Sequence, residues 1–197
     1  TSTRKHLCII ILNWNGAPDT CACLTSLQTC NREDIELSVV VIDNGSTDDS
    51  IKIIEKDHPW VTVIPLGENK GFSGGNNAGI QYALDHHADV IWLLNNDTIV
   101  DTNALVSLVD AFKEDSVGVA GSKIYFAPGR EYHKERYVKK DRGRVLWYAG
   151  GIIDWNNMYA SHRGVDEVDK GQYGAVVETP FVTGCSMMVK KEVFEKI

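Results

Sequence analysis

Four short, largely apolar runs, separated by segments with helical spacing, constrain the fold of this chain more than any other feature. They occupy residues 7–12, 37–42, 61–66 and 90–94. Such runs are typical of strands that are buried on both faces, as in parallel sheets. Helix signals lie between them, such as Pro18 ahead of Leu24 and Leu27. The alternation predicts βαβ units and an α/β fold, with a mostly parallel central sheet flanked by helices.

The composition excludes some classes of protein. A length of 197 residues with 43% hydrophobic residues suffices for a folded core, and the net charge of −7 argues against a nucleic-acid partner. The only apolar stretch near the start, residues 7–12, is too short for a signal peptide or a membrane span. Five cysteines without metal-site spacing predict reduced thiols. We therefore expect a cytoplasmic protein, with the inner face of the membrane as the alternative, and the oligomeric state stays open.

The character of the sequence changes after about residue 121. Residues 125–146 are rich in Lys and Arg and lack periodicity, which predicts a long basic loop. A hairpin is expected around 154–157, and residues 181–189 predict a strand that leads into a helix starting at Lys191. We divide the chain into 1–120 and 121–197, with a basic insertion at 125–146.

Polar side chains follow three of the apolar runs at the point where each run ends. They are Asn13 and Asn15, Asp43 and Asn44, and the triplet Asn95-Asn96-Asp97. Ligands of open α/β sheets bind at the carboxyl ends of the strands, so these residues predict a cleft that suits a metal, a ribose or a base. A hard cation takes oxygen ligands, and Asp97 alone would suffice if a bound diphosphate supplied the others. The alternative is that these residues form ordinary capping turns.

A glycine-rich segment at residues 71–75 is expected to form a loop ahead of a helix. Helix N-termini favour anions, and Lys70 could pair with a phosphate there, although a plain strand-to-helix turn would look the same. No G-x-G-x-x-G motif follows the first run, which argues against a nicotinamide-dependent dehydrogenase. Trp14, between two asparagines, could offer its face to a nucleobase or simply pack against its neighbours.

Taken in order, the segments at residues 10–15, 41–48, 69–79 and 93–97 resemble family 2 glycosyltransferases. The resemblance is strongest to the rhamnosyltransferase-like and galactofuranosyltransferase-like branch of bacterial cell-surface synthesis. It implies a Rossmann-like nucleotide-diphospho-sugar transferase fold of the GT-A type. The implied reaction is the inverting transfer of a sugar from a nucleotide-diphosphate donor to a glycan or lipid-linked acceptor, in polysaccharide synthesis and cell wall biogenesis.

The resemblance also implies a role for each residue of the donor half, 1–120. Asn13 and Asn15 would flank the base, and Asp43 with Asn44 would bind base or ribose. The remaining nucleotide-sugar contacts would come from Lys70, Gly71, Asn76, Asn95 and Asn96. Asp97 would hold a Mg²⁺ or Mn²⁺ ion.

The later part of the sequence resembles the acceptor side of such enzymes, with Trp147, Thr183 and Gly184 as candidate residues. The family's catalytic base belongs to a Glu-Asp pair that would follow Ile197, so residues 121–197 are expected to be an incomplete acceptor half. A C-terminally truncated transferase without its base would be inactive or weakly active. A non-catalytic nucleotide-sugar binding module is the alternative. The basic residues between 130 and 144 would suit an anionic acceptor or peripheral contact with a membrane, although a solvated loop has the same composition.

Overall fold

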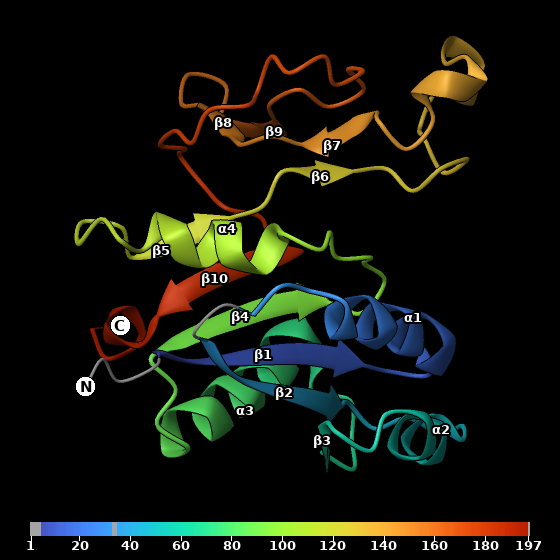
Figure 1. Ribbon diagram of the computed structural model, residues 1–197, viewed down its shortest axis with the longest axis vertical. Helices are drawn as coiled ribbons and strands as arrows, with labels where there is room; N and C mark the ends of the chain where they lie inside the picture. The colour runs from blue at the N-terminus through green and yellow to red at the C-terminus, as the bar shows by residue number, and fades with distance from the viewer. Residues whose placement is uncertain (1–4, 33–34, 197) are drawn as a thin grey trace. The chain divides into compact units, whose positions relative to one another are not determined.

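The computed structural model describes residues 5–32 and 35–196, which fold into two compact units (Figure 1). The first unit comprises Thr1–Ala120 and Gly184–Ile197, and the second comprises Gly121–Thr183. The predicted division near residue 120 falls at the edge of the first unit. The division into a donor half and an acceptor half stays a prediction, and its boundaries differ from those of the compact units, because β10, which follows residue 184, pairs with β4 in the first unit's sheet.

A six-stranded sheet forms the centre of the first unit, in the order β3-β2-β1-β4-β10-β5. Its strands are β1 (Lys5–Asn13), β2 (Ile35–Asp43), β3 (Thr62–Pro65), β4 (Val90–Asn95), β5 (Val119–Gly121) and β10 (Ser186–Lys190). Strand β1 pairs in parallel with both β2 and β4, and β2 pairs in parallel with β3. Strand β10 runs antiparallel to β4. The sheet is therefore mostly parallel, as predicted.

Helices cover both faces of this sheet (Figure 1). They are α1 (Ala17–Gln28), α2 (Ser50–Asp57), α3 (Gly71–Asp85), α4 (Ala104–Ala111) and the short α5 (Lys191–Phe194). Ile9 and Ile11 of β1 belong to the core cluster that contains residues of α1, α2 and α4. Ile10 belongs to the other cluster, which contains residues of α3. Because successive side chains of a strand point to opposite faces, the uninterrupted apolar run of β1 is buried on both sides.

The segment at residues 71–75 differs from the predicted loop, because α3 begins at Gly71 and these residues form its first turns. Close packing against β1 explains two of the glycines in this helix. A Cβ atom at Gly75 would collide with Leu12, and one at Gly79 would lie 2.5 Å from Ile10 Cγ2. These glycines let the helix approach the sheet, rather than letting the chain turn.

The second unit contains two small antiparallel sheets. Strands β6 (Ile124–Tyr125) and β7 (Leu146–Tyr148) form one, and β8 (Gly151–Asp154) and β9 (Tyr159–His162) form the other. The second pair is the hairpin predicted around 154–157. The basic insertion is irregular apart from the 3-10 turns η1 (Lys134–Arg136) and η2 (Lys139–Asp141). The strand expected at 181–189 is shorter than predicted, since the Phe181 carbonyl accepts a hydrogen bond from Tyr148 Oη at 2.6 Å and β10 begins only at Ser186.

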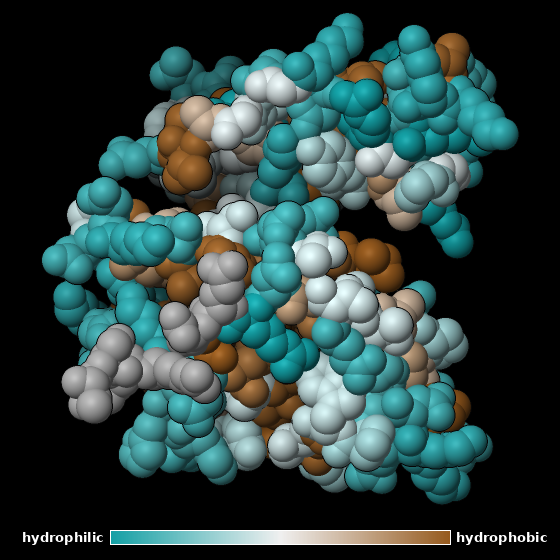
Figure 2. All heavy atoms as spheres, viewed as in Figure 1, coloured by the Kyte–Doolittle hydropathy of each residue, from teal (hydrophilic) through white to brown (hydrophobic). Residues whose placement is uncertain are grey.

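The surface is largely hydrophilic on the face shown in Figure 2, where hydrophobic side chains form separate patches. Within the described part of the chain, no helix is long and apolar enough to span a bilayer.

Candidate functional site

The ends of three strands meet at one edge of the sheet. Asn13 at the end of β1 is in register with Asp43 of β2, and Leu12 is in register with Asn95 of β4. The strand order reverses here, because the chain moves from β1 outward to β2 and β3 and then returns to β4 on the other side of β1. Such a switch point is where open α/β sheets bind ligands. A pocket of about 270 Å³ lies there, lined by Leu12, Trp14, Phe72, Asn95, Asn96 and Asp97.

Asn13 and Asp43 form a buried polar pair beside this pocket. Asn13 is 0% and Asp43 1% exposed, and Asn13 Nδ2 donates to Asp43 Oδ2 at 2.9 Å. Ser46 closes the carboxylate from the other side, since its backbone N–H donates to Oδ1 at 2.9 Å and its hydroxyl donates to Oδ2 at 2.5 Å. The carboxylate thus accepts three hydrogen bonds within the protein, two at Oδ2 and one at Oδ1. Oδ1 can accept a further bond, and the 1% exposure of Asp43 is what limits the access of a ligand.

Asn15 holds the loop that follows β2. Its backbone adopts a φ of 50°, in the left-handed region that asparagine tolerates better than most residues. Its N–H donates to Ser46 Oγ at 2.9 Å, and its Oδ1 accepts from the N–H of Thr47 at 2.8 Å. Asn15 therefore fixes the position of the Ser46 cover over Asp43.

Asn44 connects the end of β2 to the start of α3. This side chain is buried, and its Oδ1 accepts from the N–H of Lys70 at 2.9 Å. Its Nδ2 donates to Asn69 Oδ1 at 3.0 Å and to the Gly71 carbonyl at 3.2 Å. Lys70 is exposed at the N-cap of α3. Asn44 is thus a support that places Lys70, and its own amide is occupied by these three bonds.

Asn76, predicted to lie along the nucleotide and diphosphate, is buried on α3. It is 6% exposed, and its Nδ2 donates to the Phe72 carbonyl one turn earlier at 2.9 Å. Its amide therefore serves its own helix, and the structure places Phe72 rather than Asn76 at the pocket.

The triplet after β4 lies at the mouth of the pocket. Asn95 and Asn96 are half-buried and Asp97 is exposed. The Asn95 carbonyl accepts from Thr98 Oγ1 at 2.8 Å, so the triplet forms part of a turn as well as lining the pocket. The capping-turn interpretation and the site interpretation are both compatible with this geometry, because Asp97 is exposed and also lines the pocket.

Two thiols lie within electrostatic range of Asp97. Burial, reinforced by the negative charge of Asp97, raises the pKa of Cys23 and of Cys185 to about 11. Without a bound cation, both thiols are therefore neutral at physiological pH. A coordinated cation would itself lower a thiol pKa, so it is the preference of Mg²⁺ and Mn²⁺ for oxygen ligands that favours the Asp97 carboxylate here.

Sequence analysis missed Thr20 and Ser46. Thr20, on α1, is 0% exposed, and its hydroxyl donates to Asn13 Oδ1 at 2.8 Å while accepting from Asn96 Nδ2 at 3.0 Å. For Thr20 the sequence does contain a signal. It lies four residues before Leu24 and seven before Leu27, and this spacing places it on the buried face of the helix.

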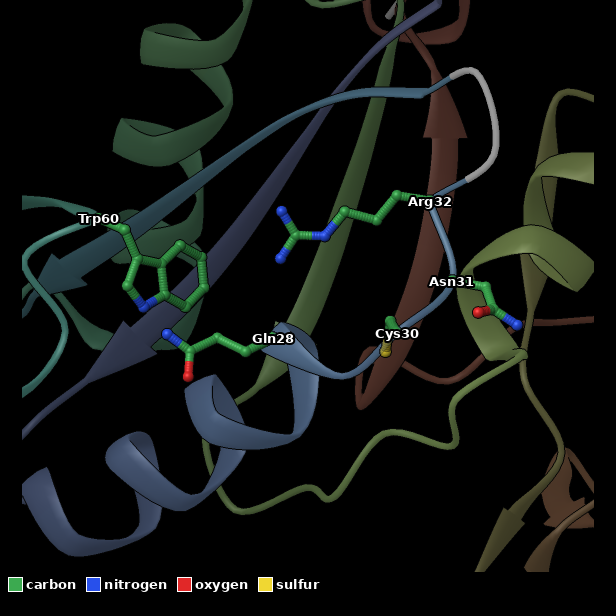
Figure 3. Close-up of a pocket in the computed structure, with 5 residues that line it drawn as sticks. All are labelled: Gln28, Cys30, Asn31, Arg32 and Trp60. Carbon is green, nitrogen blue, oxygen red and sulfur yellow. The ribbon is translucent and has the colours of Figure 1, made fainter.

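A second pocket, of about 680 Å³, lies away from these residues (Figure 3). It is lined by Gln28, Cys30, Asn31, Arg32 and Trp60. Arg32 precedes β2 and Trp60 precedes β3, so this pocket lies at the amino ends of the strands. No residue of the predicted site contributes to it.

The predicted acceptor-side residues are divided between the two units. Trp147 and Thr183 belong to the second unit, and Gly184 belongs to the first. Trp147 contacts His162 edge to face, with ring centroids 4.4 Å apart. A Cβ atom at Gly184 would lie 3.4 Å from Phe72 Cζ, which places Gly184 beside a residue of the 270 Å³ pocket.

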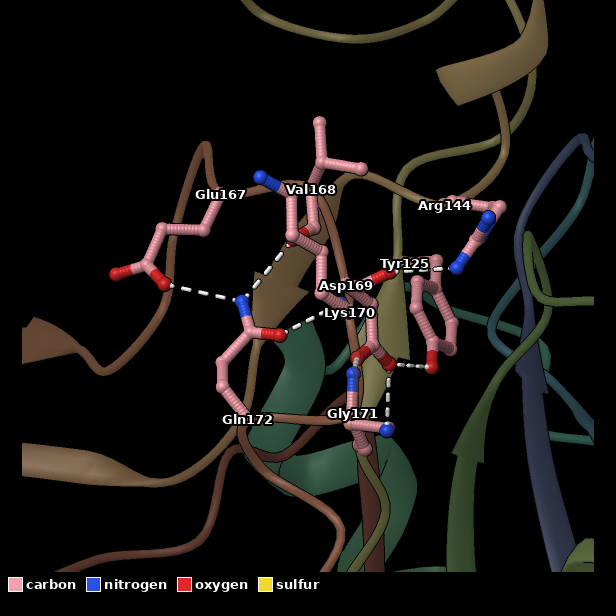
Figure 4. A network of polar contacts seen from close by, with 9 residues as sticks. Tyr125, Arg144, Glu167, Val168, Asp169, Lys170, Gly171 and Gln172 are labelled. Atoms are coloured by element: carbon pink, nitrogen blue, oxygen red, sulfur yellow. Dashed lines mark hydrogen bonds and ion pairs between the residues drawn. The ribbon is translucent and has the colours of Figure 1, made fainter.

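The second unit is organised around Asp169, which is 7% exposed (Figure 4). Its Oδ2 accepts from Lys123 Nζ at 2.6 Å and from the Tyr125 hydroxyl, and its Oδ1 accepts from the Gly171 N–H at 2.7 Å. Hydrogen bonds from Lys123 and Tyr125 hold the pKa of Asp169 well below its usual range. Arg144, at the end of the basic insertion, donates to the Asp169 carbonyl at 2.7 Å and so attaches the insertion to this centre.

Comparison with known proteins identifies the family. The family model of glycosyl transferase family 2 matches residues 8–197, and the chain therefore belongs to this family. Chondroitin synthase of Escherichia coli is 28% identical over 88 residues, which are 43% of this chain and 12% of that protein. Poly-beta-1,6-N-acetyl-D-glucosamine synthase of Staphylococcus aureus (strain COL) is 32% identical over 79 residues, which are 39% of this chain and 18% of that protein. The matches thus span less than a fifth of these relatives.

Solved structures confirm the GT-A-type fold. The mannosyltransferase PcManGT from Pyrobaculum calidifontis, in complex with GDP-Man and Mn²⁺, superposes with a TM-score of 0.62 at 17% identity. That match covers 99% of this chain and 47% of the other. S. aureus TarS 1–349 in complex with UDP-GlcNAc gives a TM-score of 0.56 at 23% identity, over 64% of this chain and 36% of the other. At these identities the likeness establishes the fold alone.

Proposed function

We propose that this chain binds a nucleotide-diphosphate sugar at the 270 Å³ pocket and serves its inverting transfer to a glycan or lipid-linked acceptor in polysaccharide synthesis. The observation that carries the proposal is the meeting of Trp14, Phe72 and the Asn95–Asp97 triplet at the switch point of the sheet. Family membership, and nucleotide-sugar complexes of two proteins with the same fold, support it. The rhamnosyltransferase-like and galactofuranosyltransferase-like branch stays a prediction.

Two aromatic side chains at this pocket suit a planar base or a sugar ring. Trp14 is 56% and Phe72 54% exposed, although aromatic rings are usually buried. They come from different parts of the chain, since Trp14 directly follows β1 and Phe72 lies in the first turn of α3. Lys70, held at the N-cap of α3 by Asn44, would bring a positive charge toward the diphosphate.

The residues present fit a divalent cation only if the substrate supplies further ligands. Among the described residues, no group of three or more His, Cys, Asp or Glu side chains could hold a metal ion. Asp97 offers one exposed carboxylate, with the amides of Asn95 and Asn96 beside it. Mg²⁺ commonly binds through one or two carboxylates together with phosphate oxygens and water. A bound Mg²⁺ or Mn²⁺ would neutralise charge on the departing diphosphate, and Asp97 would hold it.

The catalytic base stays a prediction. The family resemblance expects it beyond Ile197, which itself lies outside the described residues, and Asp154 and Glu178 are the alternatives within the chain. Hydrogen bonds from Asn157 and from the N–H of Asn156 lower the pKa of Asp154. A lowered pKa makes a weaker base, so the geometry disfavours Asp154.

The test is isothermal calorimetry with UDP, dTDP, GDP and NAD, each measured with Mn²⁺ and with a chelator. We expect one nucleoside diphosphate to bind more tightly with Mn²⁺, and NAD to bind no better than background. Metal and nucleotide affinities are linked reciprocally, so in Asp97→Asn the nucleotide Kd measured with Mn²⁺ should equal the Kd measured with a chelator. Asp19→Asn, which removes an exposed carboxylate from α1, is the matched control and should leave them apart.

Three outcomes would count against the proposal. Binding of none of the diphosphates would refute the site, and tighter binding of NAD would favour a dinucleotide enzyme. Equal affinities with and without Mn²⁺ in the wild type would remove the metal role from Asp97.

A further inference from the structure

A chain of hydrogen bonds joins the ends of β4, β1 and β2 through helix α1. Asn96 Nδ2 donates to Thr20 Oγ1 at 3.0 Å, and Thr20 Oγ1 donates to Asn13 Oδ1 at 2.8 Å. Asn13 Nδ2 donates in turn to Asp43 Oδ2 at 2.9 Å. The bonds all point in one direction and end on a carboxylate.

The chemistry of the end group fixes that direction. An ionised carboxylate only accepts hydrogen bonds, so Asn13 must present its Nδ2 to Asp43, which leaves its Oδ1 facing Thr20. Because Oδ1 also only accepts, the Thr20 hydroxyl must donate to it, and its oxygen is then the acceptor for Asn96. Thr20 and Asn13 are both 0% exposed, so water does not compete for these bonds. Hydrogen bonds that point the same way strengthen one another.

Gly16 leaves the space that the Asn96 amide occupies. A Cβ atom at Gly16 would lie 2.9 Å from Asn96 Nδ2 and 3.5 Å from Asn13 Oδ1. The backbone of Gly16 also accepts from the Thr20 N–H at 3.0 Å, so the first turn of α1 places the hydroxyl and the gap together. Since Asn96 immediately precedes Asp97, holding its amide also restricts the turn that presents the Asp97 carboxylate.

We propose that Thr20 is a positioning residue that links Asp43, on the nucleoside side of the site, to Asn96 and the metal ligand Asp97. Thr20 is fully buried and reaches the site only through these two neighbours. The inference rests on the proposed function, because Asp97 holds a cation only if the chain binds a nucleoside diphosphate. It follows that the gain in nucleotide affinity caused by Mn²⁺ depends on the Thr20 hydroxyl.

The experiment compares this gain in wild type and in Thr20→Val, which keeps the side-chain shape and removes the hydroxyl. UDP, dTDP or GDP, whichever the wild type binds most tightly, is titrated with Mn²⁺ and with a chelator, and the ratio of the two Kd values gives the gain. Loss of one buried hydrogen bond corresponds to a fall of about 3- to 10-fold in this ratio. Thr20→Ser keeps the hydroxyl and should keep the ratio.

Two further variants complete the test. Thr25→Val makes the same substitution on the same helix, where the hydroxyl bonds only to the Cys21 carbonyl at 2.8 Å, and should leave the ratio unchanged. Gly16→Ala adds a methyl group 2.9 Å from Asn96 Nδ2 and should lower the ratio with Thr20 intact. Gly16→Ala also carries the test if Thr20→Val fails to fold.

The outcomes separate this inference from the proposed function. A wild-type ratio retained in Thr20→Val, or in Gly16→Ala if that variant alone folds, would overturn the role of Thr20. A ratio as low in Thr20→Ser as in Thr20→Val would also overturn it, because loss of the hydroxyl would then not be the cause of the lower ratio. A wild type that binds none of UDP, dTDP and GDP would refute the proposed function itself, and this result is obtained without any of the variants.

Discussion

Gly45 is the position where a single methyl group should disturb the site most clearly. Its φ is +77°, and a Cβ atom there would lie 2.6 Å from the Glu68 carbonyl carbon and 2.8 Å from the Asn69 nitrogen. Both are backbone atoms, which cannot rotate away as a side chain can. The backbone conformation costs a non-glycine residue about 1–2 kcal/mol, and overpacking adds about 1–3 kcal/mol. Gly45→Ala should therefore lower the free energy of unfolding by about 2–5 kcal/mol.

Gly67→Ala provides the matched control. Gly67 has a φ of +76°, and nothing lies within 4 Å of the position of its Cβ atom. Gly67→Ala should therefore lower the free energy of unfolding only by the cost of the left-handed backbone conformation, without a collision. Urea unfolding followed by circular dichroism would compare the two variants, and calorimetry would measure nucleotide binding. Gly45→Ala should also weaken binding, because residues 68 and 69 lead directly into Lys70. Equal losses of stability in the two variants would refute the argument from close backbone approach.

Three further changes have expected outcomes. Asp43→Ala should weaken nucleotide binding by about 1–3 kcal/mol in calorimetry, and unchanged affinity would remove Asp43 from the site. Lys123→Met should lower the unfolding free energy at pH 7 by about 1–3 kcal/mol. Because the pKa of Asp169 is lowered in the folded state, this stabilisation is present above its ordinary pKa and is lost as the pH falls toward the folded-state pKa. The difference between variant and wild type in urea unfolding should therefore begin to shrink below about pH 4 and shrink further at lower pH, and a constant difference would contradict this. The double variant Lys139→Glu, Lys140→Glu should bind anionic vesicles more weakly in co-sedimentation, with a loss of about 1 kcal/mol of binding free energy for each residue near the surface. If the wild type shows no preference for anionic over neutral vesicles, the membrane contact is excluded.

The parallel core was predictable because its strands are apolar on both faces. A run such as residues 90–94, with no polar alternation, fits only a strand covered on both sides, and β4 occupies Val90–Asn95. The place of β10 was not predictable in this way. Its residues, Ser186–Lys190, carry no signal of direction, and pairing with β4 in antiparallel fashion is set by tertiary contacts between segments far apart in the chain.

The candidate site was predictable in position and less so in detail. Asn13, Asp43 and Asn95 follow apolar runs, and the parallel register brings them to one edge. Which of them faces a ligand depends on partners that no local pattern reveals. Asp43 is predicted to bind base or ribose, with a capping role near Ser46 as the alternative, and in the structure Ser46, three residues along the chain, donates to its carboxylate. Their contacts with a nucleotide stay predictions.

The burial of Asn76 could be predicted from helical periodicity. It lies three residues before Gly79 and seven before Ala83, and all three are buried on α3. Residues with this spacing share one helix face, so the position belongs to the face that packs on the sheet. Once 71–75 is recognised as helix rather than loop, Asn76 falls on the inner side. Phe72 lies one turn earlier on the same face, so periodicity alone does not predict its exposure at the pocket.

The close packing of α3 on β1 connects the core to the pocket. Leu12 packs against the helix at Gly75 and also lines the pocket, together with Phe72 of the same helix and the Asn95–Asp97 triplet. A larger residue at position 75 would push the helix away from Leu12, and Phe72 and the N-cap residue Lys70 would move with it. Because protein interiors are close-packed and give little, the shift would be passed to the first turn instead of being absorbed in the core. The glycine at position 75 thus acts on the site through packing, although it contributes no group that a nucleotide could contact.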